Sequence, residues 1–351
     1  MLENVLIRAD GSKDIGMGHI NRALIISSYL ATTKGSFCTL ITKISDSTKI
    51  FLESKLEFDN KFLNVIWIPE HTTLDEEIEF ILNFQKSNAT SFFVIDLLEE
   101  SRPQNYVNSF KNKKIKIMLF SDSSKADNSY CDYFINGNPC LDANSFADNK
   151  YNIKRFCGIE NFIMSENHIF HEANDPSKLK KYRLLVTIGA TDHNNILFKV
   201  LRSLDKVKKE HEIEVLVVAS DAAGYSEDLK NILKSSTFDS NLKINLKCLS
   251  EVWEMADIAI TAGGNTLFER VAAGLPGMTV TQLARQSKIS ERFEELDINT
   301  HIGFGPDLEL DFISNRVNNF LSNKEAQRNQ FLNCKRFFKN SPLDNIFLNF
   351  S

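Results

Sequence analysis

The sequence predicts an α/β protein with two doubly wound, Rossmann-like domains that face each other across a cleft. Two observations predict this fold. Short, continuously apolar segments alternate with amphipathic segments, as is typical of parallel strands that helices cover on both faces. One polar segment, residues 166–182, interrupts this alternation, so the 351 residues divide into two parts of ordinary domain size.

The N-terminal part alternates predicted strands and helices from its first residues. Its continuous apolar runs predict strands at residues 5–7, 37–42, 65–68, 92–95, 115–120 and 133–135. Helices are predicted after residue 18 and over residues 74–85, where apolar residues recur at helical spacing. Repetition of strand and helix implies a parallel sheet with right-handed crossovers.

The same alternation predicts a second domain after the polar segment, which we interpret as a linker. Predicted strands lie at residues 184–188, 215–219, 244–249, 258–260 and 278–280, and helices at residues 266–273 and 287–296. The amphipathic tail over residues 323–338 predicts a last helix. We therefore expect domains at residues 1–170 and 180–322, and a C-terminal helix within residues 323–351 that packs back on the protein.

Composition and charge exclude several classes of function. Lys and Arg number 41 and Asp and Glu 46, and a net charge of −5 argues against binding of nucleic acid. No run of about 18 apolar residues predicts a membrane-spanning helix, and the first residues carry Glu3 and no basic region, unlike a signal peptide. We expect a cytoplasmic protein with no cofactor and no metal, and we interpret His168 and His171 as exposed linker residues rather than as a metal-binding pair.

A glycine-rich loop follows the first predicted strand. Gly16 and Gly18 stand directly before His19, where a helix is predicted to begin. Glycines let the backbone approach a ligand closely, and a helix N-terminus offers unpaired N–H groups. A protonated histidine gains nothing from the helix dipole at this position, so we expect His19 to be neutral and able to accept a proton. Arg22 follows three residues later, on the same side of the helix.

The second domain has a similar loop after its first predicted strand. Gly189, Thr191 and Asp192 follow that strand in the place that the glycine-rich loop occupies in the first domain. Loops at the carboxyl ends of strands are where open α/β sheets bind ligands. Asp192 has a second interpretation, as the N-cap of the following helix.

The most informative segment follows the predicted strand at residues 258–260. Gly263 and Gly264 form a turn there and a helix begins, an arrangement that suits phosphate groups. Glu269 falls about one turn inside this helix, where its carboxylate can accept hydrogen bonds from the diol of a ribose. The alternative is a capping or surface carboxylate. Gln286 follows the next predicted strand, at the same edge of the sheet.

Together these motifs resemble a known family. The motifs are Arg8-Ala9-Asp10, Gly16-x-Gly18-His19-x-x-Arg22, Gly189-Ala190-Thr191-Asp192 and Gly263-Gly264…Glu269…Gly274-Leu275-Pro276…Gln286. They are similar to those of the UDP-sugar hydrolases of pseudaminic acid biosynthesis, which belong to the GT-B proteins related to the glycosyltransferase that makes lipid II. The resemblance runs from about residue 4 to about residue 300, and it implies the GT-B arrangement of two Rossmann-like domains.

The resemblance also implies a reaction and a site. Water would attack the anomeric carbon of a UDP-linked 2,4-diacetamido-2,4,6-trideoxyhexose with inversion, and His19 would activate or position that water. The expected catalytic residues are His19 and Asp10. The expected substrate-binding residues are Gly16, Gly18, Arg22, Asp96 and Gln286, and the expected nucleotide-binding residues are Gly189, Thr191, Asp192, Gly263, Gly264, Asn265, Thr266 and Glu269.

Two other functions stay open beside the hydrolase. One is an inverting GT-B glycosyltransferase of surface-glycan assembly, which would use a nucleotide-sugar donor and could contact a membrane peripherally. The other is an inactive nucleotide-sugar binding protein, against which His19 argues. The chain differs from the hydrolase pattern after Asp96, where Leu97 and Leu98 stand in place of His and Tyr.

Overall fold

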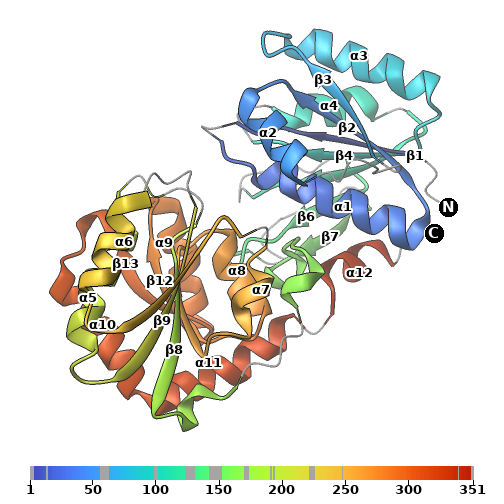
Figure 1. The fold of residues 1–351 in the computed structure, drawn as a ribbon. Coiled ribbons are helices and arrows are strands. Elements are labelled where there is room, and N and C mark those ends of the chain that lie inside the picture. The colour runs from blue at the N-terminus through green and yellow to red at the C-terminus, as the bar shows by residue number, and fades with distance from the viewer. Residues whose placement is uncertain are drawn as a thin grey trace. The chain divides into compact units, whose positions relative to one another are not determined.

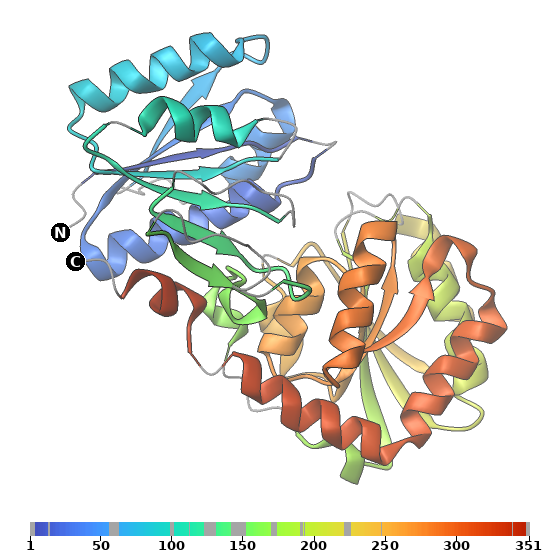
Figure 2. The ribbon, with the colours of Figure 1, turned by 180° about the vertical axis from the view of Figure 1, so that it is seen from behind.

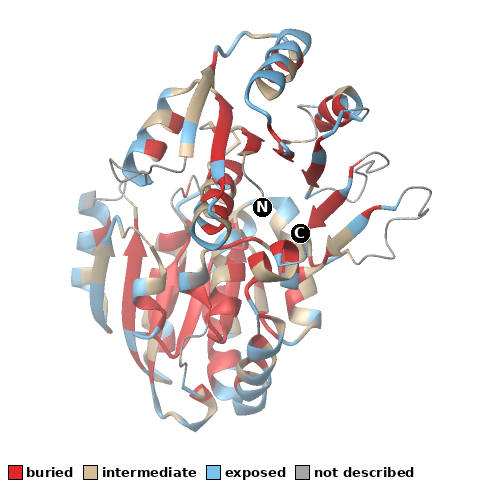
Figure 3. Ribbon diagram, turned by 90° about the vertical axis from the view of Figure 1, so that its right-hand side faces the viewer, coloured by how far each residue is buried: buried red, intermediate tan, exposed pale blue. Residues whose placement is uncertain are grey.

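The chain folds into two compact α/β units. The computed structural model describes residues 4–12, 15–55, 63–98, 102–111, 113–122, 131–141, 152–169, 174–189, 192, 194–220, 226–246, 248–338 and 340–348. Unit 1 comprises Met1–Met164 and Pro342–Ser351, and unit 2 comprises Ser165–Ser341. Each unit is a parallel sheet with helices on both faces (Figure 1; Figure 2), and the central strands of both sheets are largely buried (Figure 3).

The described residues of unit 1 form a seven-stranded parallel sheet in the order β3-β2-β1-β4-β5-β6-β7. The strands are β1 (Asn4–Ala9), β2 (Phe37–Lys43), β3 (Leu63–Ile68), β4 (Phe92–Asp96), β5 (Lys116–Phe120), β6 (Tyr133–Asn136) and β7 (Lys154–Cys157). The first six confirm the predicted strands. The prediction missed β7, because this short edge strand carries Lys154 and Arg155 and so has no apolar run.

Two core layers enclose this sheet. The helices are α1 (Gly18–Lys34), α2 (Asp46–Lys55), α3 (Leu74–Ser87), α4 (Pro103–Phe110) and α12 (Pro342–Phe347), with a 3₁₀ turn η3 (Ile159–Asn161). Helices α1, α2 and α12 contribute to the core on one face, and α3 and α4 to the core on the other. Thr73 and Glu76 form a capping box at the start of α3, which fixes where this helix begins.

The described residues of unit 2 form a six-stranded parallel sheet in the order β10-β9-β8-β11-β12-β13. The strands are β8 (Lys181–Thr187), β9 (Glu212–Ala219), β10 (Asp239–Ile244), β11 (Ile258–Thr261), β12 (Gly277–Thr281) and β13 (Thr300–Phe304). The strand predicted at residues 244–249 is wrong, because β10 ends at Ile244. This edge strand pairs with β9 alone and is largely polar, so it shows no continuous apolar signal.

Helices again cover both faces of the unit 2 sheet. They are α5 (Ile196–Val207), α6 (Ser226–Ser235), α7 (Ser250–Trp253), α8 (Asn265–Ala272), α9 (Ala284–Glu295), α10 (Leu310–Ser322) and α11 (Lys324–Phe337), with η4 (Glu166–His168), η5 (Pro176–Lys178) and η7 (Gly305–Asp307). Helix α11 confirms the helix predicted over residues 323–338, but it is not the last one, because α12 follows it in unit 1. None of the described helices is long and apolar enough to cross a membrane.

Candidate functional site

The two sheets share one topological feature, a reversal of strand order beside the first strand. In unit 1 the order reverses between β1 and β4, where Ala9 pairs with Asp96, and in unit 2 between β8 and β11. Doubly wound sheets bind their ligands outside the carboxyl ends of the strands at such switch points. The described residues of the predicted site lie at the ends of strands of these two sheets or in the loops and helices that follow them.

The loop after β1 brings α1 to the switch point of unit 1. Ser12 and Gly16 pair through their backbones, with the Gly16 N–H 2.9 Å from the Ser12 carbonyl oxygen. Gly16 adopts a φ of +80°, a conformation that other residues rarely adopt. Helix α1 then begins at Gly18 and places His19 in its first turn.

His19, Arg22 and Asp96 form one hydrogen-bonded cluster. His19 Nδ1 lies 2.7 Å from Asp96 Oδ1, and Arg22 binds both oxygens of this carboxylate, at 2.6 Å through Nε and 2.7 Å through Nη2. Asp96 is only 1% exposed, whereas the His19 side chain remains 11% exposed. The Arg22 guanidinium also lies over the Phe120 ring, 5.1 Å from its centroid. The structure therefore brings together three of the predicted site residues.

Charge controls the protonation of this cluster. Burial alone would raise the pKa of Asp96, but the charges of Arg22 and His19 outweigh it and hold that pKa well below its ordinary value. Burial would likewise lower the pKa of His19, but the Asp96 charge outweighs it and raises that pKa above 6.5. The helix dipole alone therefore does not decide the protonation of His19, because the Asp96 carboxylate favours the protonated ring.

The cluster leaves one ring nitrogen of His19 able to accept a proton. Since Asp96 is ionised, its oxygen accepts the hydrogen of His19 Nδ1, and neutral His19 then carries its lone pair on Nε2. Among the described residues, none hydrogen-bonds to Nε2. A base with a free nitrogen, oriented by a buried carboxylate, is the arrangement that activates a hydroxyl nucleophile.

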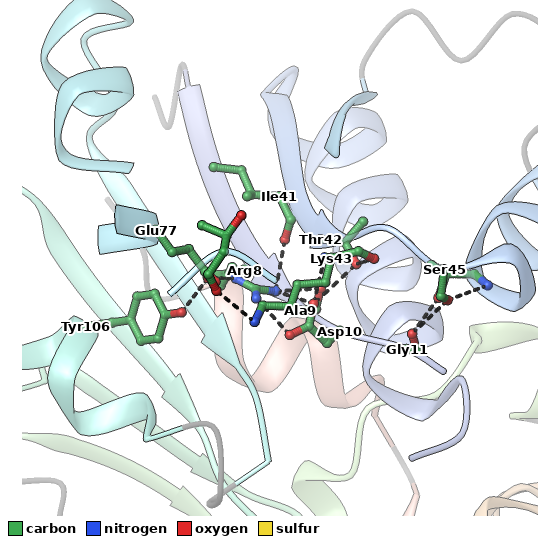
Figure 4. A network of polar contacts seen from close by, with 12 residues as sticks. Arg8, Ala9, Asp10, Gly11, Ile41, Thr42, Lys43, Ser45, Glu77 and Tyr106 are labelled. Atoms are coloured by element: carbon green, nitrogen blue, oxygen red, sulfur yellow. Dashed lines mark hydrogen bonds and ion pairs between the residues drawn. The ribbon is translucent and has the colours of Figure 1, made fainter. Parts of the chain in front are cut away.

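Asp10 belongs to a different network, shown in Figure 4. Its carboxylate accepts hydrogen bonds from Arg8 at 2.6 and 2.7 Å and from the Lys43 backbone N–H at 2.8 Å. Arg8 also pairs with Glu77, which accepts a hydrogen bond from Tyr106. Within the described part of the chain no hydrogen bond joins Asp10 to His19. Asp10 ties the end of β1 to β2, and its catalytic role stays a prediction.

A second cluster lies at the carboxyl edge of unit 2. Gly263 and Gly264 follow β11, and a Cβ on Gly263 would come within 2.7 Å of both Ser290 Oγ and Thr281 Cγ2, so only glycine fits there. Gln286 Oε1 accepts the backbone N–H of Gln282 at 3.0 Å, and Gln286 Nε2 lies 3.4 Å from where a Cβ on Gly264 would stand. The structure thus brings the predicted Gly263, Gly264 and Gln286 together.

Helix α8 begins at this turn. Its first residues are Asn265 and Thr266, and no described side chain caps its N-terminus at Gly264. The first N–H groups of the helix therefore stay available to an anion. Glu269 lies one turn later, with its side chain 19% exposed.

The loop after β8 is only partly described. Gly189 has a φ of +90°, and Gln282 Nε2 donates to the carbonyl oxygen of Ile188 at 2.6 Å, which holds the ends of β8 and β12 together. Asp192 is buried, and its carboxylate accepts the N–H groups of residues 196 and 197 at 2.9 and 2.7 Å. Asp192 thus binds the first N–H groups of α5, although Asn195 and not Asp192 is the N-cap residue of this helix. Thr191 lies outside the described residues, and a nucleotide-binding role for this loop stays a prediction.

Sequence reasoning missed one residue of this cluster, His168. It was interpreted as an exposed linker residue, but it is 4% exposed and belongs to unit 2. Its Nδ1 lies 2.9 Å from Trp253 Nε1 and its Nε2 lies 3.8 Å from Glu269 Oε1. No local spacing could have found this contact, because the partners are 85 and 101 residues away in the sequence. His171 lies outside the described residues.

Comparison with known proteins gives distant relatives. No protein family defined by a sequence profile matches the chain. The chain is 25% identical over 320 residues to the spore coat polysaccharide biosynthesis protein SpsG of Bacillus subtilis, covering 90% of this chain and 88% of SpsG. It is 25% identical over 306 residues to an uncharacterized protein of Methanocaldococcus jannaschii, covering 85% of this chain and 60% of that longer protein.

A third relative has a named activity. The UDP-2,4-diacetamido-2,4,6-trideoxy-beta-L-altropyranose hydrolase of Campylobacter jejuni is 22% identical over 241 residues, which cover 68% of this chain and 77% of the hydrolase. Among solved structures, MurG of Acinetobacter baumannii matches 98% of both chains with a TM-score of 0.72 and 10% identity. The spinosyn rhamnosyltransferase SpnG, complexed with thymidine diphosphate, matches 98% of both chains with a TM-score of 0.65 and 9% identity. These neighbours confirm the predicted GT-B fold of two doubly wound α/β domains.

Proposed function

We propose that this protein is a nucleotide-sugar enzyme of the glycosyltransferase type. It breaks the bond between the anomeric carbon of a sugar and a nucleoside diphosphate, and it transfers the sugar to a hydroxyl group of an acceptor. The observation that carries the proposal is the cluster of His19, Asp96 and Arg22, which leaves His19 Nε2 able to accept a proton. The polysaccharide biosynthesis function in the name of SpsG and the thymidine diphosphate in the SpnG complex support it.

The chemistry needs one base and a place for the diphosphate. As the acceptor oxygen attacks the anomeric carbon, its proton moves to His19 Nε2, and the electron pair of the breaking C–O bond leaves with the diphosphate. Asp96 stabilises the imidazolium that forms and keeps the ring in the required tautomer. Because the diphosphate leaves readily, the second carboxylic acid of ordinary glycosidases is not needed.

The edge of unit 2 suits the nucleotide. The first N–H groups of α8 carry the partial positive charge that stabilises phosphate, and Gly263 and Gly264 let the backbone approach it closely. The Glu269 carboxylate accepts hydrogen bonds from the ribose hydroxyls. We propose that the nucleoside diphosphate binds here.

Hydrolysis is the second candidate function. In that reaction His19 would activate water instead of an acceptor, and no other residue would change its role. The similarity to the Campylobacter jejuni hydrolase favours it, at 22% identity. The same residues therefore serve either reaction. The two reactions differ only in the nucleophile, which is water in hydrolysis and an acceptor hydroxyl group in transfer.

Nucleotide release from a panel of UDP-, dTDP- and CMP-sugars tests the proposal, with and without mono- and disaccharide acceptors. A glycosyltransferase releases nucleotide fast only when an acceptor is present, and the labelled sugar then appears in a larger product. If nucleotide is released equally fast without an acceptor, the enzyme is a hydrolase and not a transferase. If the protein binds the nucleotide-sugars but releases no nucleotide with or without an acceptor, it is a binding protein. That result would overturn both the transferase and the hydrolase.

A further inference from the structure

Two hydroxyl groups at the start of α2 contact the carbonyl oxygen of Gly11, in the loop that follows β1. Thr48 Oγ1 donates to this oxygen at 2.6 Å, and Ser45 Oγ lies 3.3 Å from it (Figure 4). Ser45 Oγ also donates to Thr48 Oγ1 at 2.7 Å, and a hydroxyl group has only one hydrogen to donate. Ser45 therefore gives its hydrogen to Thr48 over the shorter distance, and Thr48, which is fully buried, is the main donor to Gly11.

Gly11 packs directly against the start of α1. A Cβ on Gly11 would come within 2.8 Å of Ile20 Cγ1 and 2.9 Å of Met17 Sδ, so a larger residue would push both side chains away. Met17 directly precedes α1, and Ile20 is a fully buried residue of its first turn, next to His19. The position of Gly11 therefore limits where the first turn of α1 can lie.

The first turn of α1 has no polar cap among the described residues. No described side chain caps the helix at Met17, and its first turn contains no acidic residue. The turn therefore lacks the stabilisation that a capping side chain or a carboxylate supplies, and packing has to hold it in place. This turn carries His19, and the 2.7 Å contact between His19 Nδ1 and Asp96 Oδ1 depends on where the turn lies.

We propose that Thr48 is a positioning residue for His19. Thr48 holds the carbonyl oxygen of Gly11, Gly11 packs against the first turn of α1, and that turn keeps His19 in contact with Asp96. All of these residues belong to unit 1. The inference rests on the proposed role of His19 as the base. A small displacement of a catalytic group costs a large part of the rate, so the loss of the Thr48 hydrogen bond lowers kcat rather than nucleotide binding.

Thr48→Val tests this inference, because it removes the hydroxyl group and keeps the branched shape of the side chain. An NMR titration of the full-length protein follows the His19 ring and needs no substrate. Burial lowers the pKa of His19, but the Asp96 charge raises it above its ordinary value, so a looser contact with Asp96 should lower it in the variant. We expect kcat on a nucleotide-sugar that the parent turns over to fall by about 10- to 100-fold, with the Kd of UDP unchanged.

Three further variants separate positioning from simple damage to the fold. Thr48→Ser keeps the hydroxyl group and should restore most of both the pKa and kcat. Thr33→Val is the matched control, because Thr33 Oγ1 also donates to a backbone carbonyl oxygen at 2.6 Å, that of Tyr29, and its loss should change neither quantity. If Thr48→Val does not fold, Gly11→Ala decides the question, since its Cβ would displace the first turn of α1 and should lower the pKa of His19 in the same way.

The possible failures are distinct. If the folded Thr48→Val variant keeps either the His19 pKa or the kcat of the parent, the positioning role is overturned. If the pKa falls as expected but the parent protein turns over no nucleotide-sugar, Thr48 positions His19 and the proposed function is wrong.

Discussion

At the scale of single residues, Asp96 influences both the pKa and the tautomer of His19. Its buried negative charge raises the pKa of His19, and its oxygen accepts the hydrogen of Nδ1. A raised pKa makes His19 a stronger base, but one that is free to act only above that pKa. Activity should therefore rise with pH as His19 loses its proton, with the midpoint above 6.5.

Asp96→Asn tests this coupling. The substitution removes the charge that raises the pKa of His19, so the acid limb of the kcat/KM profile should move to lower pH. The rate at the optimum should fall by about 10²–10⁴-fold, because the ring loses both its orientation and the stabilisation of its protonated form. A pH–rate profile of both proteins measures the two effects. If the acid limb of the kcat/KM profile lies at the same pH in both proteins, a group other than His19 controls it.

At the scale of elements, the last helix of the chain completes the core of unit 1. Helix α12 buries Ile346 and Phe347 beneath α1, and Tyr29 of α1 donates a hydrogen bond to Asp344 at 2.6 Å. The Tyr29 and Phe347 rings pack with their centroids 5.8 Å apart. Helix α1 carries His19 and Arg22, so the end of the chain supports the helix that holds the candidate base.

Ile346→Ala should therefore destabilise unit 1. The residue is fully buried, so losing its side chain leaves a cavity that costs about 2–5 kcal/mol. Urea unfolding followed by fluorescence measures the change. Leu348→Ala is the control, because Leu348 is 65% exposed and its loss should change stability by less than about 0.5 kcal/mol. Equal effects of the two substitutions would show that α12 does not pack as described.

Elements also show how far the sequence predicts this fold. Central strands such as β4 and β8 have apolar runs because both of their faces are buried, and these were predicted correctly. Edge strands β7 and β13 were missed and β10 was misplaced, since one edge of each is open and their residues are partly polar. His19 and Arg22 were predicted because they follow a glycine-rich loop at the start of a predicted helix, and Asp96, which ends β4, was predicted from the family resemblance. His168 was missed because its burial depends on Trp253, far away in the sequence.

At the scale of the whole molecule, we expect the two units to differ in their sensitivity to acid. Burial would raise the pKa values of Asp10 and Asp96, but their arginine partners lower both. A carboxylate with a lowered pKa stabilises the fold above its unfolded pKa of about 3.9, and this stabilisation is lost as pH falls further. The contribution of His19, whose pKa is raised, is fully present below its unfolded pKa of about 6.5 and does not change in this range. Both aspartates belong to unit 1.

Unit 1 should therefore unfold first when pH falls below about 4. The chain has two tryptophans, Trp67 in unit 1 and Trp253 in unit 2, so each unit carries its own fluorescent probe. Acid titration of Trp253→Phe, which reports on Trp67, should give a midpoint at higher pH than titration of Trp67→Phe. The reverse order would contradict the view that the paired aspartates dominate the acid sensitivity.

The proposed function depends on His19 as the base of the reaction. Its most direct test compares His19→Ala with the parent protein, using kcat on a UDP-sugar that the parent turns over and the Kd of UDP measured by calorimetry. We expect kcat to fall by about 10²–10⁴-fold, while the Kd of UDP stays within about twofold because the proposed nucleotide site belongs to unit 2. A His19→Ala variant with the full kcat of the parent would contradict it.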